Sequence, residues 1–218
     1  MKPLHLPMRV WDLPTRLFHW ALVILVFTSW LTQNRNWMEL HALSGYAILT
    51  LLLFRLAWGF VGSDTARFRH FIKSPFAALR HLSHITRREP DTEIGHNAAG
   101  GWMVLVILAL LLVQAGSGLF SNDDVAMEGP FATRVGKEWS DWAGHLHGLS
   151  WDLIKIMILA HVLAVIAYFV LKGQNLVRPM ITGKKRMPGA MAGPRMMHSG
   201  LAAALAIVAA GIVTLLVR

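Results

Sequence analysis

Hydrophobic residues in this sequence gather in five long runs, which polar and charged connections separate. Each run is close to the ~20 residues that a helix needs to cross the hydrocarbon of a bilayer. None of them alternates as a strand does, and lipid admits only helices or closed barrels. The pattern predicts an all-α integral membrane protein, a four-helix transmembrane bundle plus a fifth C-terminal helix. The predicted helices are Thr15–Leu31, Leu40–Val61, Ala98–Phe120, Trp151–Leu171 and Leu201–Val217.

Lysine and arginine are distributed unevenly among the connections. The N-terminus to residue 16 has three, and residues 61–97 and 172–198 have six each, but residues 32–39 have one and residues 121–149 have two. Because basic loops stay in the cytoplasm, we expect a cytoplasmic N-terminus. The net charge of +9 then reflects topology, and no nucleic-acid partner is expected. The 121–149 loop would face outward, where its five acidic residues could dock a basic partner or simply be solvated.

The chain divides into three predicted parts. Residues 1–175 form the four-helix unit, residues 176–199 a basic cytoplasmic linker, and residues 200–218 the last transmembrane helix. The linker is rich in Gly, Pro, Met, Lys and Arg, a composition typical of a connection rather than a packed element. The last helix has small residues and no candidate ligand, so it is predicted to serve anchoring or assembly, for example of a homo-oligomer.

Four of the eleven histidines lie inside or at the edge of the apolar runs, where ionisable side chains are costly and usually functional. With the expected topology, His41 and His147 lie near the outer face, and His19 and His161 near the cytoplasmic face. His161 follows His147 by fourteen residues, about 21 Å along a helix. The sequence therefore predicts two levels with one histidine pair each, His41/His147 and His19/His161.

His145 is the competing residue on the fourth helix. Fourteen steps of about 100° return to within about 40° of the same helix face, whereas the sixteen steps from His145 to His161 point nearly the opposite way. The spacing therefore selects His147.

Paired imidazoles from facing helices are the ligands of bis-histidine haem iron. Zinc would require about four ligands at one level, and neither level offers them. The chain has no cysteine, which excludes thiolate-held metals and the attachment of a c-type haem. Coordination and packing alone must hold any haem here.

Other residues fit this interpretation, although each has a plainer alternative. Gly45, one turn beyond His41, would leave room for a porphyrin, or it could serve helix packing. Arg16 and Arg67 could neutralise the propionates of an inner haem, or they could be ordinary cytoplasmic anchors. His96 could border a quinone site, or it could be an interfacial residue.

Several motifs together resemble those of bacterial cytochrome b561-type proteins, which include the b-type cytochrome subunits of nickel–iron hydrogenases. The resemblance covers about residues 8–186. It rests on Arg9-Val10-Trp11-Asp12, Arg16-Leu17-Phe18-His19-Trp20, His41 with Gly45-Tyr46, Arg55, Trp58-Gly59-Phe60-Val61-Gly62, Ala66-Arg67-Phe68, Gly95-His96-Asn97, His147 with His161, and Met180-Ile181-Thr182-Gly183.

The resemblance implies a bacterial inner-membrane cytochrome with two haem b groups, and its ligands fall on the same four histidines. The expected function is an electron relay between the quinone pool and a periplasmic or membrane redox partner, such as a c-type cytochrome or a dehydrogenase, with quinone bound at one of the two levels. Two alternatives stay open: a quinone-linked oxidoreductase acting on a small substrate such as superoxide, and a membrane anchor for a redox complex. The fifth helix departs from the shortest members of the family.

Overall fold

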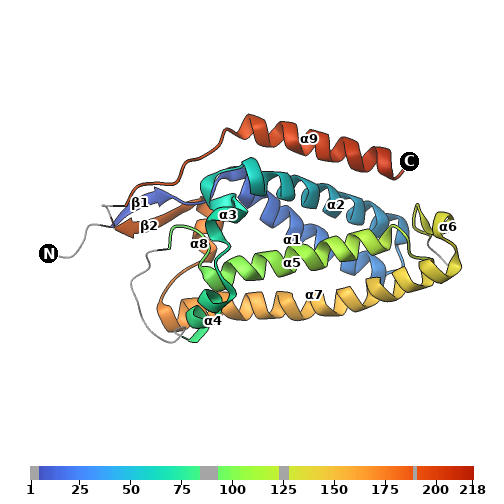
Figure 1. The fold of residues 1–218 in the computed structure, drawn as a ribbon, viewed down its shortest axis with the longest axis horizontal. Coiled ribbons are helices and arrows are strands. Elements are labelled where there is room, and N and C mark those ends of the chain that lie inside the picture. Colours follow the sequence, from blue (N-terminus) through green and yellow to red (C-terminus); the bar gives the residue numbers. More distant parts are fainter. Residues whose placement is uncertain (1–4, 84–92, 123–127, 189–190) are drawn as a thin grey trace.

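The computed structural model describes residues 5–83, 93–122, 128–188 and 191–218. Within these residues five helices are long and apolar enough to cross a membrane. They are α1 (Leu13–Asn34), α2 (Met38–Val61), α5 (Ala98–Gly118), α7 (Lys137–Lys172) and α9 (Ser199–Leu216). All five run along the long axis of the molecule (Figure 1). The predicted all-α membrane fold with five transmembrane helices is confirmed.

The first four of these helices form the bundle. Helix α1 packs on α2, α5 packs on α7, and α2 contacts α5 between the two pairs. Leu52 and Trp58 of α2 and Ile154 of α7 are among its most deeply buried side chains. Helix α9 lies along α2, on the opposite side of the molecule from α7 (Figure 1).

Side-chain caps explain where two of these helices begin. Asp12 precedes α1, and its Oδ1 accepts a hydrogen bond from the backbone N–H of Thr15 at 2.7 Å, which satisfies one free donor of the first turn. The other oxygen, Oδ2, accepts from the indole N–H of Trp58 at 3.1 Å and so ties α1 to α2. Asn97 caps α5 in the same way through the backbone N–H of Gly100.

The fourth membrane helix is much longer than predicted. It begins at Lys137, not near Trp151, and its 36 residues extend about 54 Å. The prediction that residues 121–149 form a loop is therefore wrong for Lys137–Leu149, which are helical. The first four turns carry polar and charged side chains among the apolar ones, so hydropathy alone could not show that the helix continues beyond the membrane. Asp123 and Asp124 of the predicted acidic loop lie outside the described residues.

The segment after α7 also differs from the predicted unpacked linker. It forms a short helix, α8 (Val177–Thr182), and a strand, β2 (Lys184–Pro188). Strand β2 pairs antiparallel with β1 (His5–Arg9). The backbone N–H groups of Val10 and Trp11 both donate to the carbonyl of Gly183, so the ribbon leads directly into α1. Backbone pairing between segments so distant in sequence leaves little trace in local composition.

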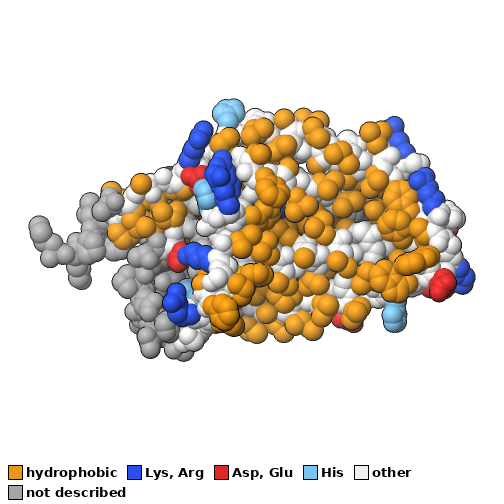
Figure 2. Space-filling model, in the orientation of Figure 1, with side chains coloured by type: hydrophobic (Ala, Val, Ile, Leu, Met, Phe, Trp, Pro, Cys, Tyr) orange, Lys and Arg blue, Asp and Glu red, His pale blue; other side chains and the backbone are white. Residues whose placement is uncertain are grey.

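Shorter elements close the two ends of the bundle. The ribbon of β1 and β2 marks one end, called here the sheet end, and the opposite end is called the α6 end (Figure 1). The short elements are η1 (Asp64–Ala66), α3 (Phe68–Phe71) and α4 (Pro75–Ser83) at the sheet end, and α6 (Ala132–Val135) at the other. Hydrophobic side chains cover the middle of the face drawn in Figure 2, and charged side chains gather near its ends. This is the surface expected of a membrane-spanning bundle.

Candidate functional site

The histidines of the α6 end, His41 on α2 and His147 on α7, face each other across the bundle. Their ring centroids lie 6.2 Å apart, with the ring planes at 77°. The Nδ1 of His41 is 2.9 Å from the backbone carbonyl of Ser29, and the Nδ1 of His147 is 2.9 Å from that of Gln114. A carbonyl oxygen only accepts, so each Nδ1 carries the proton and each Nε2 keeps its lone pair. A backbone carbonyl that fixes the tautomer in this way is the usual support of a metal-binding imidazole.

The separation of these rings fits two imidazoles that bind one metal ion from opposite sides. A metal–nitrogen bond of about 2 Å, with each ring centroid about 1.1 Å behind its nitrogen, places the centroids about 6.2 Å apart. The structure therefore brings together the predicted pair at a spacing that suits bis-histidine iron. A direct hydrogen bond between two imidazoles would place the rings closer together.

A cavity of about 400 Å³ opens beside this pair, lined by residues of α1, α2, α5 and α7. Gly45 belongs to its wall, and a Cβ at that position would meet no atom within 4 Å, so the space beside this residue is open. Gly118, in contrast, lies in a crowded place, because a Cβ there would lie 3.0 Å from Cε1 of His147. The close approach of α5 to the His147 ring leaves little room for a larger residue at this position.

Gln114 is a site residue that the sequence analysis missed. Its side-chain amide lies 2.9 Å from Nε2 of His147, and Ser150 donates a hydrogen bond to its Oε1. With Nδ1 of His147 protonated, the Gln114 amide N–H donates to the lone pair of Nε2. One glutamine thus supports His147 twice, through its backbone carbonyl and through its side chain. A polar residue within an otherwise apolar helix was the available signal.

The second predicted pair lies toward the sheet end. The ring centroids of His19 on α1 and His161 on α7 are 6.4 Å apart, with the planes at 55°. This spacing matches that of the first pair and suits the same kind of metal coordination. The Nδ1 of His19 is buried and has no hydrogen-bond partner among the described residues. Within the described part of the chain, no three His, Cys, Asp or Glu side chains cluster to hold a metal ion at either level.

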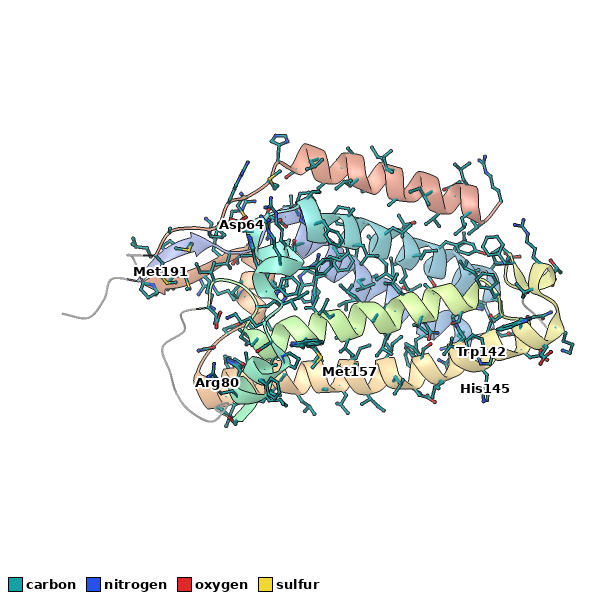
Figure 3. All side chains as sticks on the ribbon, in the orientation of Figure 1. Asp64, Arg80, Trp142, His145, Met157 and Met191 are labelled. Carbon is teal, nitrogen blue, oxygen red and sulfur yellow. The ribbon has the colours of Figure 1, made fainter. Side chains whose placement is uncertain are left out.

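His145, the rejected alternative to His147, is exposed on α7 and points away from the bundle (Figure 3). The helical spacing therefore selected the residue that the structure places inside the bundle. This leaves His145 as a natural control for experiments on His147.

Arg55 is a second residue that the sequence analysis did not assign to the site. It follows His41 by fourteen residues, the same interval that separates His147 from His161, so it lies on the same helix face about 21 Å nearer the sheet end. Arg55 is only 2% exposed. Its guanidinium lies 5.0 Å from the centroid of the Phe68 ring, and its Nη1 has no hydrogen-bond partner among the described residues. A buried cation with a free donor suits a carboxylate such as a haem propionate.

The two arginines predicted to neutralise propionates already have protein contacts. The guanidinium of Arg16 donates to the backbone carbonyl of Ile181, although its Nε is buried without a partner in the described chain. Arg67 donates from Nε to the carbonyl of Gly62 at 2.7 Å and lies 3.8 Å from Asp64. Of these cations, Arg55 is the most deeply buried, and Arg67 mainly caps the end of α2.

His96 lies at the sheet end, just before α5. Its ring is held between Trp11 and Phe71, at centroid distances of 4.7 Å and 4.8 Å, and its Nδ1 is buried without a partner among the described residues. Burial, followed by the charge of Arg55 and then the imidazoles of His161 and His19, lowers the pKa of His96 to about 3. His96 also lines a second cavity, of about 390 Å³. It is thus a packed, neutral residue, and its role beside a quinone stays a prediction.

The family model described as prokaryotic cytochrome b561 matches residues 10–183. This range includes both histidine pairs, Arg55 and His96, and it ends before α9. A search of curated proteins gives no match.

Proposed function

Because the chain belongs to the prokaryotic cytochrome b561 family, whose members are membrane cytochromes that transfer electrons through haem b, we propose that it relays electrons through two haem groups. One haem b would be held by His41 and His147, and the other by His19 and His161. The relay would connect the quinone pool, with quinone bound at one of the two levels, to a periplasmic or membrane redox partner such as a c-type cytochrome or a dehydrogenase.

The observation that carries this proposal is the repetition of one geometry at two depths. Both pairs have ring centroids near the separation expected for bis-histidine iron, 6.2 Å and 6.4 Å. They are offset by the fourteen residues between His147 and His161, about 21 Å along α7. Two one-electron centres spaced along the membrane normal are what a transmembrane relay requires, and a single haem would not need the second pair.

The protein's contribution at each level is to hold, orient and tune the cofactor. Haem iron supplies the reversible one-electron chemistry. Ser29 and Gln114 fix the tautomers of His41 and His147 through their backbone carbonyls, which leaves the lone pair of each ring on Nε2. The Gln114 side chain, which donates to Nε2 of His147, would have to turn away for that nitrogen to bind iron. Arg55 places a buried positive charge at the other level, which favours an electron there and can bind a propionate.

The test is a reduced-minus-oxidised visible spectrum of the detergent-purified chain, with pyridine haemochrome quantification. We expect about two haem b per chain, falling to about one in His41→Ala and in His161→Ala. His145→Ala is the matched control, because this exposed residue lies on the same helix only two positions from His147, and the variant should keep both haems. A chain without haem, or His41→Ala and His161→Ala variants with unchanged content, would refute the two-level relay.

A further inference from the structure

An ion pair occupies the open side of α7, within its apolar half. The Nζ of Lys155 lies 2.8 Å from Oδ1 of Asp152, and the two side chains are 53% and 65% exposed. Apolar residues surround the pair on the same side, including Ile156 at 61% and Leu159 at 59% exposure. The pair is thus set in a surface that is otherwise suited to lipid.

The length of α5 indicates how deep in the membrane Asp152 and Lys155 lie. Gly118, at the end of α5, lies directly against His147, and the 21 residues of α5 extend about 31 Å, the thickness of the hydrocarbon. His147 is therefore near the edge of the hydrocarbon at the α6 end. Asp152 and Lys155 follow it by five and eight residues, which places their backbones about 7.5 Å and 12 Å inside. Both charges belong to the membrane interior.

No described element of the chain covers this side of α7. Helix α7 packs on α5 and α6, whereas α9, the one membrane helix outside the four-helix bundle, lies against α2 and α1. Charged side chains at such depth normally face protein or a water-filled cavity instead of lipid. The exposed pair therefore indicates that another transmembrane element lies against α7.

We propose that this element is α7 of a second copy of the chain. The patch carries one charge of each sign and is therefore complementary to itself, as a two-fold interface requires. Both copies insert in the same direction, so equal depths meet. Asp152 of one copy then lies three residues, about 4.5 Å in rise, from Lys155 of the other, within reach of a lysine side chain.

The surrounding surface has the spacing of a two-helix seam. Exposed residues recur along α7 at alternating intervals of three and four positions, the repeat by which parallel helices pack in left-handed pairs. A polar residue within such a seam fixes its register. The seam residues are Leu149, Asp152, Ile156, Leu159, Leu163 and Ile166.

Disulfide crosslinking in membranes tests this interface, and the absence of cysteine from the chain makes single-cysteine variants unambiguous. Leu159→Cys places the reporter on the seam. Ile207→Cys is the matched control, because Ile207 is 72% exposed but belongs to α9 on the other side of the molecule. After mild oxidation at low expression, a non-reducing gel should show several-fold more covalent dimer for Leu159→Cys than for Ile207→Cys. Equal yields, or an adduct whose mass is not twice that of the chain, would overturn the proposal.

Charge exchange at the ion pair tests what holds the interface. In the Leu159→Cys background, Asp152→Lys sets like charges against each other and should reduce the dimer to the level of the control. Adding Lys155→Asp restores one charge of each sign and should restore the dimer. A dimer that Asp152→Lys leaves unchanged would show that the charges do not form the interface. If that variant does not accumulate in the membrane, the comparison of Leu159→Cys with Ile207→Cys still decides the proposal.

Discussion

The neutral His96 should make the protein less stable as the pH falls below 7. Its ring is enclosed by Trp11 and Phe71, and Arg55 lies close enough to oppose a second positive charge. These surroundings lower the pKa of His96 from its ordinary value of 6.5 to about 3 in the folded chain. The unfolded chain would bind a proton on this residue near pH 6.5, and the folded chain would not.

The sign and size of the effect follow from proton linkage. Between pH 6.5 and pH 3 the unfolded state binds more protons at this position, so the free energy of unfolding falls as the pH falls. Each pH unit in this window changes it by about 1.4 kcal/mol for one fully linked proton. The loss between pH 7 and pH 5 is therefore about 2 kcal/mol. Above pH 6.5 the residue is neutral in both states, so it no longer lowers the free energy of unfolding.

Thermal unfolding of the detergent-purified chain at pH 7, 6 and 5 measures this effect. We expect Tm of the native chain to fall by roughly 4–8 °C between pH 7 and pH 5, using the scaling for domains of this size. His96→Gln removes this titrating group and should make the fall in Tm between pH 7 and pH 5 smaller than in the native chain, whatever its Tm at pH 7. His70→Gln is the control, because His70 is half-exposed at the same end of the bundle. Parallel pH curves for the native chain and His96→Gln would refute the reasoning.

Three further changes test the packing and electrostatics of the site. Gly118→Val should lower the haem content toward one haem b per chain by pyridine haemochrome assay, because the added Cβ would lie 3.0 Å from the His147 ring. An unchanged content would show that the ring can shift without losing its ligand. Arg55→Gln should lower the midpoint potential of one haem by about 60 mV, a tenfold change in the one-electron equilibrium, because a buried positive charge that favours the reduced state is lost. Redox titration should show a much smaller shift for Arg55→Lys, and an equal shift would contradict a role for charge. Gly59→Ala should lower the free energy of unfolding by about 1–3 kcal/mol in a denaturant titration, because its Cβ would lie 2.0 Å from the Phe68 ring, and unaltered stability would mean that this ring moves freely.

Hydropathy and helical spacing could predict the parts of the molecule that depend on membrane thickness. The apolar runs located the five helices, since lipid requires long uninterrupted apolar segments. The interval between His147 and His161 predicted both the pairing and the choice against His145. Each residue of a helix adds a fixed rise and a fixed rotation, so the interval gives the difference in depth and in direction. The family resemblance is also confirmed. Iron ligation, the number of haems and the quinone stay predictions.

Features that depend on contacts between distant segments of the chain could not be predicted in the same way. The extension of α7 beyond the membrane is amphipathic and mixed in charge, so it resembles a solvated loop in composition. The β1–β2 ribbon joins segments about 180 residues apart, and neither strand has a distinctive local pattern. Arg55 and Gln114 were visible as polar residues in apolar runs, but their relation to the histidines depends on which helices face each other.

The ribbon also sets an order of events in the biosynthesis of the protein. Residues His5–Arg9 are synthesised before the four bundle helices, whereas their partners Lys184–Pro188 are synthesised after them. The strand next to α1 therefore has no β2 partner while those helices are made, and the β1–β2 ribbon can form only after all four bundle helices have been synthesised. We expect a bulky fusion before β1 to hinder the pairing of β1 with β2. A fusion after α9, which ends at the opposite end of the molecule (Figure 1), should leave this pairing intact.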